Sequence, residues 1–361
     1  MRFSIVLPAT ILLAACSSIG PGTVPRDRAD YSSAIGDSWK QQTLLNIVRL
    51  RYADFPIFME ISQVIAGYQF QTAVGAGASV QNYISSSVGV VPPAVAGSVT
   101  AGATYIDRPT VIYAPLTGTD FIKKLMAPIP PAAVLFLLQS GYSANLVMPL
   151  AVDSVNGIAN ESRRAQMRRP ADPQFVRLTQ LLYELQIANA LQIRIERSKD
   201  QETSVMGFPA LSPAPELAGK VAEVRRILRL SPHTAGYSVH YGGYTGKGDG
   251  IALQTRSMLQ IMLELGVMAQ VPDADVAGGR ATPGATAVRP GDADRAAALE
   301  IHSGPSAPAD AHVAVSYKGR WFWVADNDVH SKGVFGAIML LFSISDVGVR
   351  TAPPVVTVPA N

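Results

Sequence analysis

Residues that could do chemistry are few in this chain, and most of them stand apart from one another. The only glycine-rich stretch that contains a lysine is Gly242–Gly250, with Lys247 inside it. A phosphate-binding loop needs the pattern G-x-x-x-x-G-K-[ST], and here Gly248 follows the lysine, so the pattern fails. We expect the stretch to form a hairpin or a long turn, with an anion-binding backbone nest as the alternative.

Metal-based and nucleophilic catalysis have equally little support. The chain has five histidines: His233, His240, His302, His312 and His330. None belongs to an H-E-x-x-H pattern, which would place two zinc ligands on one helix face, and no G-x-S-x-G presents a serine nucleophile. Asp326 and Asp328 lack the glycine and glutamate of a calcium loop, so we expect them to cap the helix that follows. We predict a protein that is not an enzyme and holds no metal.

Two further groups could bind a ligand without reacting with it. Trp321 and Trp323 alternate along a predicted strand, which favours packing in the core or an interface, with a sugar-stacking platform as the alternative. Four arginines gather before Pro170: Arg163, Arg164, Arg168 and Arg169. This basic cluster predicts a solvated loop, and contact with lipid headgroups or peptidoglycan is the alternative.

The single cysteine, Cys16, ends an apolar stretch at the start of the chain. Arg2 supplies a minimal positive region, and Phe3–Leu13 has the character of a signal-peptide h-region. This apolar stretch is too short to span a bilayer. The run Leu13-Ala14-Ala15-Cys16 resembles the lipobox of bacterial lipoproteins, which signal peptidase II cleaves between Ala15 and Cys16.

That resemblance implies a lipid anchor. Cys16 would carry a diacylglycerol thioether and an acyl group such as palmitate, and two or three acyl chains hold a protein stably on a membrane. Ser17, where retained lipoproteins have an aspartate, is similar to an outer-membrane sorting signal. The resemblance places the mature chain at the periplasmic face of the bacterial outer membrane, with surface exposure as a variant. It would leave no thiol for a disulfide or a thiolate metal site, and no cofactor beyond the acyl groups.

Composition narrows the class of protein further. Of 361 residues, 48% are hydrophobic and only 16% are charged, against about 25% charged in a typical soluble domain. This apolar content is enough to bury a core, which excludes a disordered chain. A net charge of +3 without a basic tract argues against nucleic-acid binding. No apolar run reaches the about 18 residues of a membrane-spanning helix.

The low content of charged residues is concentrated in one segment of the chain. From Ile61 to Ile106 there is no Asp, Glu, Lys or Arg. Two arms in this stretch alternate apolar residues with small or polar ones, which predicts a β-hairpin within residues 66–113. Each arm exceeds the roughly 10 residues that a spanning strand needs, but a lone hairpin leaves backbone groups unsatisfied in lipid, so insertion would take several copies. Packing against protein and a flexible loop are the alternatives. The predicted contact residues are Tyr68, Phe70, Val74, Val80, Val99 and Tyr105.

The remaining elements predict an α+β fold of mixed helices and antiparallel strands, with a long charge-free β-hairpin and a smaller C-terminal α+β domain. Helices are expected at 33–52, 120–126, 130–139, 173–187, 217–230, 255–268 and 329–344, and strands at 110–113, 146–155, 191–195, 236–241, 311–317 and 320–325. The predicted organisation is a signal peptide (1–15), a lipidated tether (16–30), an N-terminal domain (31–197), a linker (198–216), a C-terminal domain (217–350) and a tail (351–361).

These observations favour a non-enzymatic outer-membrane lipoprotein. We expect it to serve as a structural, assembly component of an envelope complex, oligomeric or bound to envelope proteins, with hairpin 61–106 contacting partners or the membrane. The leader and composition resemble those of uncharacterised proteobacterial outer-membrane lipoproteins, and this resemblance implies no described activity. The alternatives are a periplasmic envelope enzyme and a glycan- or lipid-binding module.

Overall fold

The computed structural model describes residues 19–65, 68–81, 94–164, 167–198, 201–208, 215–232, 234, 236–244, 246, 248–284 and 299–345. The chain divides into two compact units. The first unit comprises Met1–Ile35 and Met59–Ala114, and the second comprises Gly36–Phe58 and Pro115–Asn361. Helices accompany antiparallel and mixed sheets, so the predicted α+β class is confirmed.

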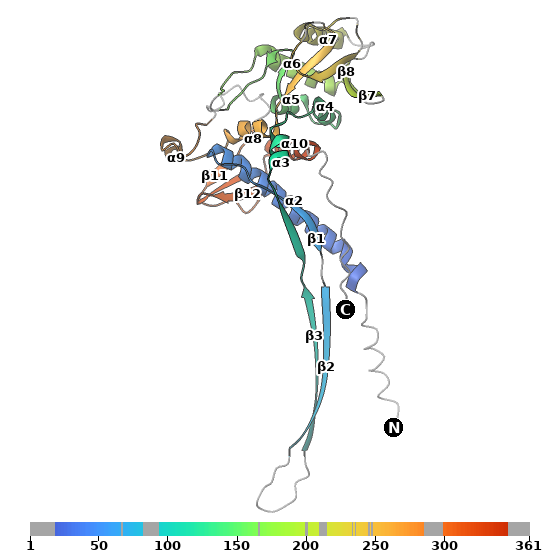
Figure 1. Ribbon diagram of the computed structural model, residues 1–361, viewed down its shortest axis with the longest axis vertical. Coiled ribbons are helices and arrows are strands. Elements are labelled where there is room, and N and C mark those ends of the chain that lie inside the picture. The colour runs from blue at the N-terminus through green and yellow to red at the C-terminus, as the bar shows by residue number, and fades with distance from the viewer. Residues whose placement is uncertain are drawn as a thin grey trace, which may run out of the picture. The chain divides into compact units, whose positions relative to one another are not determined.

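The first unit contains a ribbon of paired strands. Strand β1 (Phe58–Ile65) pairs with β4 (Thr110–Leu116), and β2 (Tyr68–Gln81) pairs with β3 (Ala94–Asp107). Figure 1 shows β2 and β3 running side by side over their whole length. The hairpin predicted within residues 66–113 is confirmed. It is one strand pair longer than expected, because the β1 and β4 segments also pair.

Helix α2 (Ile19–Arg51) corrects the predicted tether. Residues 16–30 were expected to be a flexible link because of their glycines and prolines, but the helix already begins at Ile19. Pro21 lies in the first turn, where its missing N–H has no helical acceptor in any case. Pro25 costs one internal hydrogen bond and leaves the helix unbroken. Glycine and proline at a helix start are therefore weak signals for a tether.

A six-stranded sheet organises the second unit. Its strands lie in the order β6-β5-β10-β9-β8-β7. Their bounds are β5 Val152–Val155, β6 Ile158–Ala159, β7 Gln192–Ser198, β8 Gln201–Gly207, β9 Gly236–Tyr241 and β10 Gly250–Thr255. Helix α4 (Pro131–Gln139) packs on this sheet, and α5 (Ala144–Ala151), α6 (Pro173–Ile187) and α7 (Pro215–Leu228) pack in succession beside α4.

A second, three-stranded sheet in the same unit has the order β11-β13-β12. The strands are β11 (His302–Gly304), β12 (Ala311–Tyr317) and β13 (Arg320–Ala325), and Lys318-Gly319 forms the tight turn predicted between β12 and β13. Helices α3 (Thr119–Met126), α8 (Met258–Gly266), α9 (Asp273–Ala277) and α10 (Val329–Ser345) complete the unit.

Aromatic packing shows how the core of the second unit is closed. The ring of Phe58, which is 3% exposed, lies 5.4 Å from the rings of both Phe121 on α3 and Phe342 on α10. Tilted ring pairs at this spacing contribute about 0.5–1.5 kcal/mol beyond the area they bury.

Local capping explains several correct predictions. The Asp172 carboxylate accepts a hydrogen bond from Gln174 N–H at 2.8 Å, and Pro173 begins α6. Ser257 and Gln260 form a reciprocal capping box at the start of α8. The Asn156-Gly157 turn has positive φ angles at both residues, as a two-residue β-hairpin turn requires.

Three predictions are wrong for identifiable reasons. Residues 144–151 form helix α5 where a strand was expected from 146, because an evenly apolar run carries no periodicity to separate the two. The predicted linker 198–216 contains β8, which pairs with both β7 and β9. The six-stranded sheet therefore draws its strands from both sides of 198–216, and the N- and C-terminal domains that were expected there share one sheet.

The third error concerns Gly242–Gly250. This stretch joins β9 to β10, and these strands pair in parallel, so it is a crossover and no hairpin. Parallel neighbours usually need a connection of a dozen or more residues. The short path is reflected in the positive φ of Gly242, Gly246 and Gly248, which favours glycine at all three positions.

Candidate functional site

Within the ribbon, the pair formed by β2 and β3 has a continuous register. All fourteen positions of β2 pair with β3, from Tyr68 opposite Asp107 to Gln81 opposite Ala94, without a bulge. At about 3.3 Å per residue the pair is roughly 46 Å long. The aromatic residues Tyr68, Phe70 and Tyr105 and the single charged residue, Asp107, all lie at one end of the pair, and small residues occupy most of the rest.

The register brings the predicted contact residues into one alternating set of positions. Phe70 lies opposite Tyr105, and Val99 lies opposite Ala76, which belongs to the same alternating series as Phe70. Tyr68, Val74 and Val80 continue that series along β2, where they face Asp107, Ala101 and Val95. The side chains of these six contact residues lie outside the described part of the structure.

The opposite series of positions is mostly open to solvent where it is described. Gly75, Thr100, Gly102 and Thr104 are all exposed, Ile106 is half-buried, and Gly75 pairs with Thr100. This series carries small residues, hydroxyls and carboxamides, with Ile106 as its one large apolar residue. The two faces of the hairpin therefore differ in side-chain type, as the period-two pattern predicts.

Both long edges of the ribbon are unpaired within the described residues. Each of its four strands has a single hydrogen-bonded neighbour. The outer edge of each strand thus presents alternate N–H and C=O groups with no ladder partner. A two-stranded sheet of this kind is marginally stable in water unless another element covers it.

The base of the ribbon, which is the strand pair β1–β4, exposes apolar side chains on both faces. Ile112 is 42% exposed and its neighbour Tyr113 is 56% exposed, and successive residues of a strand point to opposite faces. Ile65 on β1 is 38% exposed. The Ser62 hydroxyl donates to the Ile112 carbonyl at 3.1 Å, which ties the two strands together. At the start of β1, Phe58 is buried against Phe121 and Phe342, whereas Ile65, Ile112 and Tyr113 farther along the pair stay exposed.

The predicted lipid-attachment residue, Cys16, and the neighbouring Ala15 lie outside the described residues. His233, Lys247 and the tail 351–361 do so as well. Among the described residues no group of three or more His, Cys, Asp or Glu side chains could hold a metal ion. No helix in that part of the chain is both long and apolar enough to cross a membrane.

The basic cluster has internal partners. Arg163 pairs with Glu161 at 2.8 Å, Arg164 with Glu264 at 3.0 Å and Arg169 with Asp153 at 3.3 Å. Arg168 donates to the carbonyls of Pro283 and Gly284. These arginines fasten a surface segment to the second unit, which is closer to the solvated-loop interpretation than to a headgroup site.

A buried polar network lies beneath this segment, and the sequence analysis did not single it out. Glu264 on α8 is 5% exposed and accepts hydrogen bonds from the Ser162 hydroxyl at 3.0 Å and the Arg163 N–H at 2.7 Å. Arg256 is 3% exposed and donates to the carbonyls of Pro149, Leu150 and Glu161. Burial lowers the pKa of Arg256.

This network has a structural purpose. Its side chains bond to one another and to backbone groups, with the exception of Arg256 Nε, which is buried without a hydrogen-bond partner among the described residues. The network joins residues about a hundred positions apart in the sequence. One signal could have revealed it: Glu264 is the lone charged residue of an otherwise apolar helix, Met258–Gly266. A charge on a buried helix needs a partner elsewhere in the chain.

A second polar cluster joins the end of α2 to the β12–β13 turn and α9. Tyr52 donates to Asp275 at 2.8 Å, Tyr317 donates to Asp54, and the Lys318 ammonium lies 4.9 Å from the centre of the Tyr52 ring. Burial and the hydrogen bond to Asp275 raise the pKa of Tyr52 to about 12. Burial and the bond to Asp54 raise the pKa of Tyr317 to about 12.

The remaining candidate residues are scattered. Asp328 caps α10 as predicted, since its carboxylate accepts from Ser331 N–H at 3.0 Å. Asp326 pairs with Lys332 at 2.7 Å. His240 and His330 are exposed. Trp321 and Trp323 lie on the outward face of the three-stranded sheet. Packing in the core is therefore wrong for Trp321, which is 38% exposed, and packing in an interface stays a prediction.

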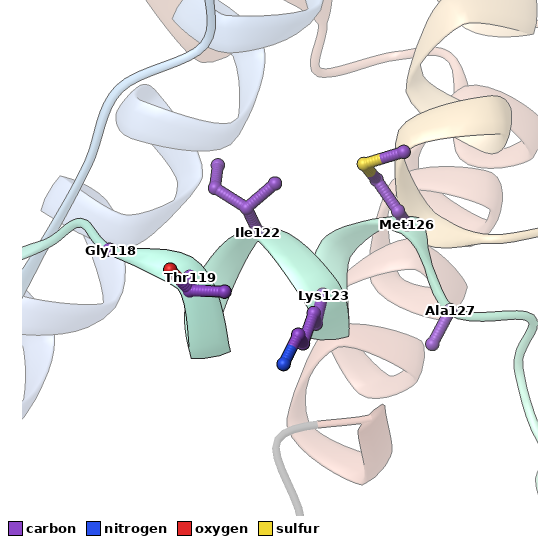
Figure 2. Close-up of a pocket in the computed structure, with 6 residues that line it drawn as sticks. All are labelled: Gly118, Thr119, Ile122, Lys123, Met126 and Ala127. Carbon is purple, nitrogen blue, oxygen red and sulfur yellow. The ribbon is translucent and has the colours of Figure 1, made fainter.

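A hollow of about 630 Å³ lies over α3, and Figure 2 shows its lining. The lining residues are Gly118, Thr119, Ile122, Lys123, Met126 and Ala127. All of them come from this one helix and its two ends, so the hollow has a single wall. Small-molecule sites bury most of the ligand between several elements, which one helix face does not do.

Comparison with known proteins gives no further guide to the site. No protein family matches this chain, and neither a curated protein nor a solved structure is significantly similar to it.

Proposed function

We propose that this chain is an outer-membrane lipoprotein that acts as a structural component of an envelope assembly, and that the ribbon is its assembly element. One observation carries the proposal. Within the described residues both edges of the ribbon are unpaired, and its base exposes Ile112 and Tyr113 on opposite faces. Apolar surface and free strand edges of this kind gain free energy when a partner covers them.

Lack of charge decides which partners fit. A natural edge strand is usually protected by a charged side chain, and residues 61–106 contain none. Two identical neutral strands can therefore pair without like-charge repulsion. This favours self-association over a strongly charged partner, and it also permits contact with lipid, where a lysine on a strand costs about 2–4 kcal/mol at the midplane.

The lipid anchor is supported by the residues at the start of the sequence. Leu13-Ala14-Ala15-Cys16 follows an h-region, and Cys16 is the only thiol of the chain. Acyl groups on Cys16 would hold the protein at the membrane and reduce its search for like copies to two dimensions. The anchor and the ribbon thus serve the same purpose, which is to concentrate and then join copies at the envelope.

The test uses the full chain expressed in a bacterium with an outer membrane. Radiolabelled palmitate should label the wild type and fail to label Cys16→Ala. Light scattering of detergent-solubilised protein after size-exclusion chromatography should give an oligomer. Deletion of residues 66–106 should give a monomer with the second unit still folded, as judged by cooperative unfolding.

Each half of the proposal can fail separately. A wild-type chain without palmitate label, found in the soluble fraction, contradicts the anchor. A strict monomer, or an oligomer that persists after deletion of 66–106, contradicts the role of the ribbon.

A further inference from the structure

The three-stranded sheet β11-β13-β12 has one buried and one open face. On β13, Phe322 and Val324 are completely buried. Trp321 and Trp323 alternate with them and so lie on the other face. Trp321 is 38% exposed, and Trp323 is half-buried. The core of the second unit therefore leaves both indoles on the outside.

The neighbouring strand holds the Trp323 indole flat against the sheet. Gly304 on β11 lies opposite Trp321, and a Cβ atom at Gly304 would lie 3.1 Å from Cη2 of Trp323. The missing side chain lets the indole lie over the backbone. His302 lies directly opposite Trp323, and the two rings are 5.8 Å apart and inclined by only 32°. The imidazole thus contacts the indole from the neighbouring strand.

Polar groups surround the two indoles. Ser316 on β12 is exposed and lies opposite Trp321 on the side away from Gly304. The Glu300 carboxylate is 66% exposed, with Oε2 3.8 Å from Nε2 of His302. A hydroxyl, an imidazole and a carboxylate supply both hydrogen-bond donors and acceptors at the margin of the two indoles.

We propose that this face, Trp321 and Trp323 with His302, Glu300 and Ser316, binds a saccharide. One side of a pyranose ring carries C–H bonds, which are attracted to the negative face of an indole. Its edge carries hydroxyls, which need donors and acceptors beside the aromatic surface. The open face supplies both in the arrangement that a sugar requires. It is separate from the ribbon, so this inference stands or falls independently of the assembly proposed above.

The test follows indole N–H signals by NMR in full-length protein labelled with ¹⁵N-tryptophan. The chain has three tryptophans, so the Trp39 signal serves as an internal reference. The probes are chitotetraose, cellotetraose and maltotetraose, each added to about 10 mM, a range that detects even millimolar dissociation constants. We expect the Trp321 and Trp323 signals to shift with at least one probe while Trp39 stays in place.

Variants then assign the site. Trp321→Ala and Trp323→Ala should each weaken binding by at least about tenfold, and Glu300→Gln should weaken it by a smaller factor. Gly304→Ala keeps both indoles but displaces Trp323 from the sheet, so it should weaken binding as well. Tyr241→Ala removes an aromatic ring that is 54% exposed on another sheet, and it should leave binding unchanged.

Three results would overturn the proposal. One is the absence of any shift of either indole signal with all three saccharides. Another is binding that survives in the Trp321→Ala and Trp323→Ala double variant. The third is a shift caused by phosphatidylglycerol vesicles and by no saccharide, which would assign the face to a membrane surface.

Discussion

The ribbon of the first unit and the six-stranded sheet of the second unit differ in how their strands find hydrogen-bond partners. Both consist of strands whose backbone groups need partners. The six-stranded sheet finds them inside the unit, since its inner strands are flanked on both sides and α4 packs on it. The ribbon has one neighbour per strand and exposed apolar residues on both faces of its base.

Charge is distributed in the same contrasting manner. In the second unit, ion pairs and buried arginines hold the unit's own segments together. Glu264 accepts a bond from Arg164, and Arg256 donates to the Leu150 carbonyl. The ribbon has no charged residue from Ile61 to Ile106, and its strands are joined by backbone ladders and by hydroxyl bonds such as that of Ser62 to the Ile112 carbonyl. The second unit thus satisfies the strands of its large sheet internally, whereas the ribbon does not within the described residues, and this difference is the basis of the partner proposed for the ribbon.

The largest expected effect concerns the stability of the second unit, whose segments are held together internally. Glu264→Gln removes the buried carboxylate that pairs with Arg164 at 3.0 Å, and the amide that replaces it has one acceptor oxygen for donors that now use two. Arg164 is 17% exposed and keeps a more distant acid, Asp153 at 4.0 Å. We expect a loss of about 3–5 kcal/mol in the free energy of unfolding, measured by urea denaturation.

The matched control for that experiment is Glu223→Gln. It removes the acid of a pair with Arg177 at 2.7 Å, in which the arginine side chain is 48% exposed. Exposed pairs contribute at most about 1 kcal/mol. Equal losses in the two variants would contradict the role we give to the buried network.

The next effect tests the ribbon with two neighbouring positions on opposite faces. Ala103→Lys places a charge in the alternating series that contains Val99 and Tyr105, and Thr104→Lys places it on the exposed face. If the first face contacts lipid or protein, Ala103→Lys should weaken assembly by about 2–4 kcal/mol, or roughly thirtyfold and more.

Thr104→Lys should leave assembly unchanged, with sedimentation velocity as the readout for both variants. Neither variant should alter unfolding of the second unit. Equal weakening by the two lysines would place the contact at the edges of the ribbon and remove the distinction between its faces.

A smaller effect concerns pH. The pKa values of Tyr52 and Tyr317 are raised from 10.0 to about 12 in the folded chain. Protonated phenols therefore stabilise the fold fully below pH 10, and this contribution is lost as the pH rises from there towards 12. Tyr52 is 5% exposed and Tyr317 is half-buried, so we expect a loss of about 2 kcal/mol over this interval.

Urea denaturation from neutral pH to about pH 11 measures this slope. The double variant Tyr52→Phe, Tyr317→Phe should have a lower free energy of unfolding at neutral pH. It should also lose less of that free energy as the pH rises. Tyr241→Phe, at an exposed tyrosine, should keep the slope of the wild type. An unchanged slope in the double variant would mean that other groups cause the alkaline loss.

Local patterns account for the parts of the fold that could be predicted from sequence. The alternation of 68–81 and 94–107 predicts the ribbon, Asp172-Pro173 predicts the start of α6, and Lys318-Gly319 predicts a hairpin. Each depends on residues that are near neighbours in the chain, where period, cap and turn chemistry act directly.

The parts that could not be predicted depend on distant partners. Nothing near Glu264 in the sequence indicates Ser162 or Arg164, about a hundred residues away. Strand β8 looks like part of a polar linker until β7 and β9 are placed on either side of it. The outward position of Trp321 depends in the same way on which face of β13 the core covers.

The pairing of β2 with β3 has one more consequence, for the exchange of backbone amide hydrogens with heavy water. In an antiparallel pair every second residue of a strand points its N–H at the partner, and the residues between point theirs outward. A lone ribbon should therefore exchange deuterium in a strict odd–even rhythm along residues 68–81. A ribbon joined at its edge by another strand should lose that rhythm on the joined side. The exchange rates of these backbone amides therefore distinguish a lone ribbon from one whose edge is paired with another strand.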